Sequence, residues 1–356
     1  MRRGANRHGY RGADASTGMD LGKVDRDFLD AHVLDHLGAS RDDVALGPKH
    51  GVDFGVLDVD GTALVAATDP VSILPALGWE RAAEFALSIV LADVAVSGIP
   101  PSHLAVSFSL PPEMTDEAFA AVWETIDAEC RDLGVSVLTG HTARYGGCSF
   151  PWVGAATAMA VGEHEDVVRP DGARPGDRVL VTNGPAAEAT GLLTTLYPEG
   201  FDLDAGTLAA AQSRLDDASC VREALRLAAA TDVHAMHDAT EGGLAGALNE
   251  VAAGAGVRID VDRDRVPLMP GVEAACRVLD VDPWACTSAG TLVATVPPGA
   301  VDDALAALRD EGATAAAVGR VSDGTGVYVD GDRLEHPDVD PSWAAFEALA
   351  AEYGDE

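Results

Sequence analysis

One carboxylate constrains this sequence more than any other residue. Asp93 lies in the run Leu91 to Val96, whose other members are Leu, Ala and Val. Apolar residues at helical spacing predict a helix from about Arg81 to Ser97 around it. An unpaired carboxylate buried in such a helix would be costly. The fold must therefore supply a cation, a metal ion or several donors to Asp93, unless it only forms a helix-end hydrogen bond to the backbone or to Ser97.

Two further carboxylates border a predicted β-hairpin. The strand-like runs Phe54 to Val59 and Thr62 to Thr68 flank Asp60-Gly61, and a two-residue Asp-Gly connection strongly favours a hairpin. Asp53 precedes the first run and Asp69 ends the second; alone, each suits a loop or a turn. Carboxylates at strand and helix ends are also the ligands of Mg²⁺ bound to triphosphate oxygens. The candidate metal ligands are therefore Asp53, Asp69 and Asp93.

A histidine marks a third segment. The run Val135 to Thr139 predicts a buried strand that leads into Gly140-His141-Thr142. His141 suits a hydrogen-bonded core position as well as a functional one. It is preceded by a predicted helix that begins near Thr115, carries acidic residues in its first turn and ends at Gly134.

A fourth segment, Met236 to Gly243, has both a structural and a functional interpretation. Asp238 and Glu241 fit a capping box for a helix with a buried stripe. Gly242-Gly243 in the first turn of that helix would cost stability. Glycines there allow a phosphate to approach the exposed N–H groups of a helix N-terminus. The segment therefore predicts either an ordinary capped helix or a phosphate site.

Common nucleotide and hydrolase motifs do not occur in the chain. There is no Gly-x-x-x-x-Gly-Lys-Ser/Thr, no Gly-x-Gly-x-x-Gly after a strand and no Gly-x-Ser-x-Gly. The five cysteines form no Cys-x-x-Cys pair, so we expect neither a zinc site nor a disulfide framework. The P-loop, Rossmann and serine-hydrolase classes are thereby excluded.

The charge balance limits the partners. The formal net charge is −34, and Lys23 and Lys49 are the only lysines. Such a surface repels nucleic acid and anionic membranes, and it predicts a protein of a salt-rich, halophilic cytoplasm. No apolar run approaches the roughly 18 residues that span a bilayer. Residues 1–18 are basic and glycine-rich, and we expect a disordered leader or a misassigned start before Met19.

Helical and strand patterns alternate along the chain, which predicts a mixed α/β architecture. The stretch Gly162 to Asp177 is polar and contains two prolines. We place a domain boundary there, with an N-terminal domain over residues 19–165 and a C-terminal domain over residues 166–356.

In order, these segments resemble the AIR synthase-like (PurM-like) superfamily, and most closely its HypE family of hydrogenase-maturation factors. The similarity covers about Leu34 to Asp330 and is carried by Leu91 to Gly98, Thr139 to Thr142, and Met236 to Leu244 with Leu248-Asn249-Glu250. The resemblance implies a two-domain fold and a homodimer. In it, the N-terminal domains pair into a β-barrel flanked by helices, and the C-terminal domain is α/β.

The resemblance also implies a site for ATP and Mg²⁺. Asp53, Asp69 and Asp93 would hold the metal, while Asp93 and His141 would be catalytic. The nucleotide would also contact residues of both domains: Asp53, Asp69, Thr142, Asp238, Thr240, Gly242 and Gly243. The implied activity is phosphorylation of an oxygen of a small molecule or of a carboxamide borne by a partner protein.

Departures from the family patterns leave the acceptor open. HypE ends in a cysteine that carries the carbamoyl group, whereas no cysteine follows Cys286 here. Ala92 and Ala289 occupy positions where polar residues are common, and the N-terminal Cys and Lys pair of selenophosphate synthetase is missing. A thiamine-monophosphate-kinase-like phosphotransferase and a catalytically idle nucleotide-binding scaffold are the alternatives. The retained aspartates favour turnover.

Overall fold

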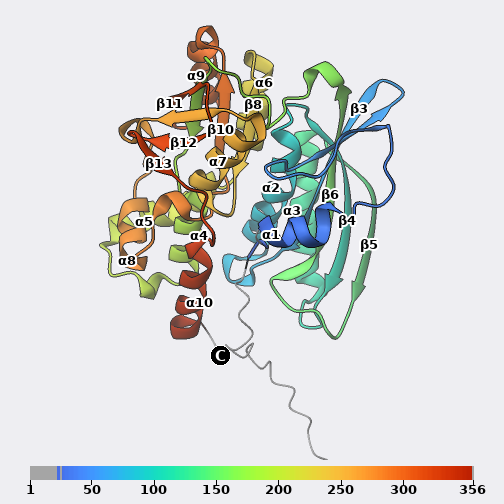
Figure 1. The fold of residues 1–356 in the computed structure, drawn as a ribbon. Coiled ribbons are helices and arrows are strands. Elements are labelled where there is room, and N and C mark those ends of the chain that lie inside the picture. The colour runs from blue at the N-terminus through green and yellow to red at the C-terminus, as the bar shows by residue number, and fades with distance from the viewer. Residues whose placement is uncertain (1–21, 25, 355–356) are drawn as a thin grey trace, which may run out of the picture.

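The computed structural model describes residues 22–24 and 26–354. The leader predicted for residues 1–18 lies outside this range. Two β-sheets, each packed against helices, stand side by side (Figure 1). The mixed α/β architecture predicted from the sequence is thereby confirmed. No helix in the described ranges has both the length and the apolar character needed to cross a membrane.

The first sheet contains six strands in the order β1-β2-β3-β6-β4-β5. Its neighbours are antiparallel except for the parallel pair β4 and β5. Helices α2 and α3 cover one face (Figure 1), and the short α1 spans Arg26–Leu29. The elements are β1 Val44–Leu46, β2 Gly55–Val59, β3 Thr62–Ser72, α2 Trp79–Ala95, β4 Pro101–Leu110, α3 Asp116–Leu133, β5 Ser136–Arg144 and β6 Trp152–Glu163.

The second sheet contains seven strands in the order β13-β12-β9-β11-β7-β10-β8. Helix α7 packs on one face, and α6 and α9 cover part of the other. The strands are β7 Arg178–Thr182, β8 Ala235–Ala239, β9 Arg258–Val261, β10 Thr291–Val296, β11 Ala315–Ser322, β12 Gly326–Val329 and β13 Asp332–Leu334. The helices are α4 Ala187–Leu196, α5 Ala205–Gln212, α6 Val221–Ala230, α7 Gly243–Ala255, α8 Val272–Leu279, α9 Val301–Asp310 and α10 Pro341–Tyr353. The predicted domain boundary lies between β6 and β7, which belong to different sheets.

Helix α2 joins the two halves. Its buried residues Val90, Leu91 and Val94 belong to the same apolar cluster as Met236 of β8 and Leu292 of β10. The helix therefore packs against the first sheet and also contacts β8 of the second. Asp93, in its last turn, lies where the two sheets meet.

The predicted hairpin turn is confirmed, and the predicted helix around Asp93 is confirmed within two residues at each end. Asp60 and Gly61 have φ of 52° and 89°, the positive values that a type I′ turn requires. The predicted strand end at Asp69 is wrong, because β3 stays paired with β6 as far as Ser72.

Two other local predictions are wrong. Asp238 lies inside β8, which pairs with β10 up to Ala239, so it does not cap α7; Gly242 occupies the N-cap position. The strand that contains His141 is not buried but is the exposed edge strand β5. In both places strand pairing, which local patterns do not reveal, decides the outcome.

Helix α3 begins as predicted, and its cap can be tested. The Oγ1 of Thr115 accepts the backbone N–H of Ala118 at 3.1 Å. We expect Thr115→Ala to lower the free energy of unfolding by about 1 kcal/mol, measured by chemical denaturation. Thr125→Ala removes a hydroxyl from the middle of the same helix, where it donates to the carbonyl of Ala121. An equal loss in both variants would show that capping is not the cause.

Candidate functional site

Four aspartates from both halves of the chain converge where the sheets meet. Asp53 precedes β2, Asp69 belongs to β3, Asp93 ends α2 and Asp238 belongs to β8. The carboxyl groups of Asp69 and Asp93 are hydrogen-bonded, and the charge of Asp238 acts on the other three. Ligand atoms of Asp53, Asp238 and His237 lie within 4.8 Å of one another. The structure therefore brings together all the predicted metal ligands.

This cluster is short of positive charge. Desolvation raises the pKa of Asp53 to about 6, and His237 opposes the shift. Burial raises the pKa of Asp93 well above its ordinary value, and the charges of Asp238, Asp53 and Asp69 raise it further. Within the described chain, the Oδ2 atoms of Asp53 and Asp69 are buried without a hydrogen-bond partner. Oxygen ligands of this kind and number suit Mg²⁺, which prefers carboxylates, water and phosphate oxygens.

His237 is an internal cation beside this cluster. Its Nε2 lies 3.4 Å from Asp53 Oδ2 and 3.1 Å from Glu250 Oε2, and its Nδ1 lies 2.6 Å from the carbonyl oxygen of Asp238. Burial alone would lower the pKa of His237, but Asp53 and Glu250 raise it to about 10. A metal-bound ring nitrogen must be deprotonated. The ring would therefore have to lose that proton to join Asp53 and Asp238 as a metal ligand, and the positions of the three side chains allow such a group.

Lys23 brings a second cation from the N-terminal segment. Its Nζ lies 3.1 Å from Thr240 Oγ1, and its backbone N–H donates to Glu241 Oε2 at 2.6 Å. Desolvation lowers the pKa of Lys23, but Asp53, Glu250 and other carboxylates reverse the effect and raise it. Sequence reasoning missed this residue, and its only signal was the rarity of lysine in the chain.

The turn before α7 requires both of its glycines. Gly242 and Gly243 have φ of 80° and 60°, and a Cβ at Gly243 would lie 2.4 Å from the carbonyl oxygen of Cys286. The N–H of Gly242 donates to Asp340 Oδ2 at 3.0 Å, and that of Gly243 to the carbonyl of Thr240. The turn therefore shapes the site beside Thr240, while these two N–H groups already have acceptors.

A further, half-buried carboxylate lies at the start of α4. Glu188 Oε2 accepts the hydroxyl of Thr287 at 2.6 Å and the N–H of Ala289 at 2.9 Å. Desolvation raises the pKa of Glu188, and the charges of Asp340 and Glu241 add to the rise. Sequence reasoning missed Glu188, because a glutamate in a first helical turn usually only complements the helix dipole.

His141 and Thr142 do not join the aspartates within one chain. Strands β6 and β4 separate β5 from β3. Val106 of β4, which is buried, and Asp69 of β3 lie in one row across the sheet. His141 pairs with Ser107, which belongs to the next row. Alternation along strands therefore directs His141 to the outer face of the sheet, where its Nε2 lies 3.2 Å from the hydroxyl of Tyr145.

Comparison with known families accounts for both halves of this arrangement. Residues 51–162 match the N-terminal domain of AIR synthase related proteins, and residues 174–332 match the C-terminal domain. The chain belongs to the AIR synthase-related family. Two relatives from this family are carbamoyl dehydratases HypE. The one from Rhizobium leguminosarum is 29% identical over 77% of each chain, and the one from Cupriavidus necator is 30% identical over 70% of each.

Solved structures agree with this AIR synthase-related fold. HypE of E. coli matches with a TM-score of 0.67 and 25% identity, over 83% of this chain and 93% of that one. HypE in complex with ATP matches with a TM-score of 0.64 and 25% identity, over 81% and 88%. AaThiL in complex with AMPPCP and TMP has a TM-score of 0.68 at 21% identity, over 91% and 99%, and shows the fold alone. The predicted PurM-like fold and the similarity to HypE are confirmed.

The charge repulsion in the cluster can be tested by removing one carboxylate. We expect Asp93→Asn to raise the free energy of unfolding in EDTA by on the order of 1 kcal/mol, because the like charges around it lose a member. The stabilisation that wild type gains from added Mg²⁺ should fall in the variant. Both effects are read from melting temperatures with and without Mg²⁺.

Asp323→Asn, at an exposed position between β11 and β12, removes one charge far from the cluster. It should leave the Mg²⁺ response intact. A loss of stability in Asp93→Asn without metal would contradict the electrostatic interpretation.

Proposed function

We propose that this AIR synthase-related protein is an ATP- and Mg²⁺-dependent enzyme that phosphorylates an oxygen of a small molecule or of a carboxamide borne by a partner protein. The observation that carries the proposal is the convergence of Asp53, Asp69, Asp93 and Asp238 with unsatisfied carboxylate oxygens. Its kinship with carbamoyl dehydratases and with a HypE that binds ATP supports the same chemistry.

In this proposal the aspartates hold Mg²⁺, which would neutralise charge on the phosphate oxygens of the nucleotide. The chain's own residues position and stabilise the reacting groups. Lys23 places a positive charge beside Thr240, and the Nε2 of His237 lies 3.4 Å from Asp53 Oδ2. Fixed charges in a site with little water stabilise a developing charge without reorganisation. Phosphoryl transfer needs mainly such positioning.

We place the acceptor on the side of the Gly242 turn where Glu188 lies. Glu188 uses only Oε2 for its hydrogen bonds to Thr287 and Ala289, so Oε1 remains to accept a hydrogen bond from an acceptor hydroxyl or amide. Its raised pKa brings the carboxyl closer to neutral pH, as a group that exchanges protons requires.

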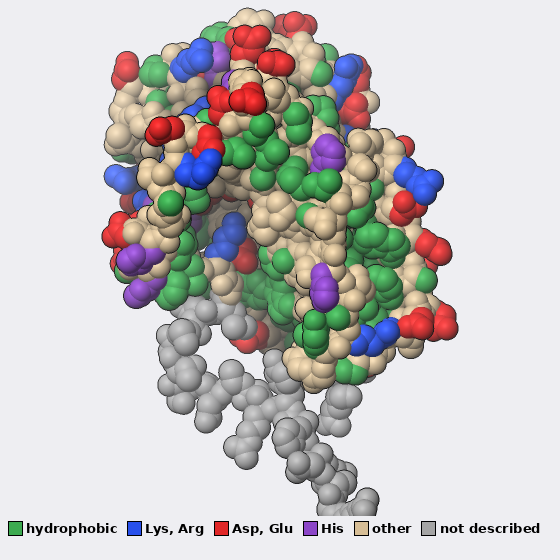
Figure 2. All heavy atoms as spheres, turned by 90° about the vertical axis from the view of Figure 1, so that its right-hand side faces the viewer, with side chains coloured by type: hydrophobic (Ala, Val, Ile, Leu, Met, Phe, Trp, Pro, Cys, Tyr) green, Lys and Arg blue, Asp and Glu red, His purple; other side chains and the backbone are tan. Residues whose placement is uncertain are grey.

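We further propose that the enzyme is a homodimer formed through the first sheet. Figure 2 shows apolar side chains gathered over this side of the molecule. Exposed apolar residues there include Leu138 of β5, 61% exposed, and Trp152 of β6, 52% exposed. Contiguous apolar surface of this kind marks protein interfaces. His141 lies on the same outer face, so the proposal assigns His141 to the site across the interface. Thr142, the next residue of β5, is directed to the opposite face and is left out of that site.

The first test is ATP binding and turnover in molar KCl, which suits a net charge of −34. We expect Mg²⁺-dependent ATP binding by calorimetry and slow phosphate release by the wild type. Asp93→Asn should lower phosphate release by about 10²-fold or more, because it removes a group that acts on the transferred phosphoryl. Asp323→Asn is the matched control. No ATP binding by the wild type would overturn the proposed function.

The dimer is tested at the edge strand. We expect Leu138→Lys to convert the dimer into monomers in analytical ultracentrifugation and to lower phosphate release, because it introduces like charges at the interface. Leu268→Lys makes the same change at an exposed position of the second half, 50% exposed, and should leave both properties unchanged. A Leu138→Lys variant that remains dimeric would contradict this interface.

A further inference from the structure

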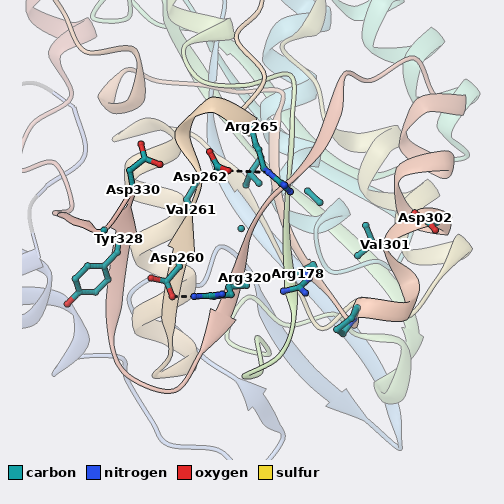
Figure 3. A pocket seen from close by; sticks show the side chains of 15 residues that line it. Arg178, Asp260, Val261, Asp262, Arg265, Val301, Asp302, Arg320, Tyr328 and Asp330 are labelled. Carbon is teal, nitrogen blue, oxygen red and sulfur yellow. Dashed lines mark ion pairs between the residues drawn. The ribbon is translucent and has the colours of Figure 1, made fainter.

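Two arginines of the second sheet are direct cross-strand neighbours. Arg178 of β7 pairs with Arg320 of β11, which in turn pairs with Asp260 of β9. Directly opposite residues place their Cβ atoms about 4.5–5.5 Å apart on one face, and like charges there destabilise the sheet. Figure 3 shows the row Asp260, Arg320 and Arg178 side by side. An unfavourable pair of this kind needs an opposing charge.

Within the described residues, the carboxylates near this pair form no ion pair with Arg178. Asp260 accepts Arg258 Nε at 2.9 Å and lies 3.9 Å from Arg320 Nε. Among residues 22–24 and 26–354, Arg178 forms no hydrogen bond or ion pair through its side chain, in a sequence with 58 acidic and 24 basic residues. Its guanidinium group is therefore available to a ligand.

These arginines line an open cleft of about 810 Å³ (Figure 3). One wall is the start of α9, with Val301 and Asp302, and the other is the ion pair of Asp262 with Arg265. The floor includes Gly319, where a Cβ would lie 2.2 Å from the carbonyl oxygen of Asp260. Glycine at this position therefore permits the close approach of β11 to β9, and the exposed side chains of Arg178 and Arg320 line the cleft.

We propose that this cleft binds a small molecule through a single carboxylate or phosphate group held by Arg178 and Arg320. Paired guanidinium groups match the planar, bidentate geometry of such oxyanions. Asp262, Asp302 and Asp330 around the cleft repel polyanions, which excludes nucleic acid and favours a ligand that also carries donors or a positive charge. This site is formed by strands of the second sheet and the start of α9, and it includes none of the residues of the proposed ATP site.

The experiment titrates the full-length protein with inorganic phosphate and, separately, with acetate, in EDTA at constant KCl. Without Mg²⁺ the aspartate cluster repels anions, so binding there is suppressed. We expect at least one of the two anions to raise the melting temperature of the wild type saturably. The double variant Arg178→Gln/Arg320→Gln should bind that anion at least tenfold more weakly. Phosphate and acetate distinguish a phosphorylated from a carboxylated ligand.

Arg277→Gln removes an exposed arginine of α8, which pairs with Glu273, and should bind the anion like the wild type. Without any anion, Arg178→Gln should melt no lower than the wild type, because it relieves like-charge repulsion. The proposal is overturned if neither anion stabilises the wild type, or if the double variant binds as well as the wild type. A lower melting temperature of Arg178→Gln without anion would likewise show a merely structural role.

Discussion

The repulsion among buried carboxylates is the constraint on which the rest of this structure depends. Desolvation and neighbouring charges raise the pKa of Asp53 and Asp93, so the bare cluster is unfavourable. The fold retains it because apolar contacts on all sides fix the backbone: α2 packs on the first sheet, and β8 is buried in the second. The packing of these elements thus keeps the carboxylates close together despite their mutual repulsion.

Histidine side chains beside the cluster partly balance the negative charge of its carboxylates. His237 is fixed between Asp53 and Glu250, and Glu250 in turn lies 3.6 Å from His336 Nε2. Burial alone would raise the pKa of Glu250, but the hydrogen bonds from His237 and His336 lower it. The shifts of His237 and Glu250 favour the charged form of each. In the proposed function, a divalent cation would balance the negative charge that remains at the aspartates.

Sequence reasoning predicted those site residues that lower the stability of their own helix. A carboxylate inside an apolar helix and glycines in a first helical turn are both unfavourable, and Asp93 and Gly242 indeed lie at the cluster and at its bordering turn. Lys23 and Glu188 carry no such local cost, because each is an ordinary residue in its own segment. Lys23 contacts Thr240, which is 217 residues away in the sequence, and Glu188 contacts Thr287, which is 99 residues away. No local pattern encodes contacts between residues so far apart. The exposure of β5 was missed for the same reason.

The two ends of the described chain meet at the Gly242 turn. Asp340, the N-cap of α10, accepts the N–H of Gly242, and a Cβ at Gly22 would lie 2.7 Å from Nε1 of Trp343 in α10. The proposed ATP site thus requires both sheets and both ends of the described chain to be in place. The cleft of Arg178 and Arg320 requires only the second sheet and the start of α9. A change that loosens the junction between the sheets should therefore weaken nucleotide binding before it affects the oxyanion cleft.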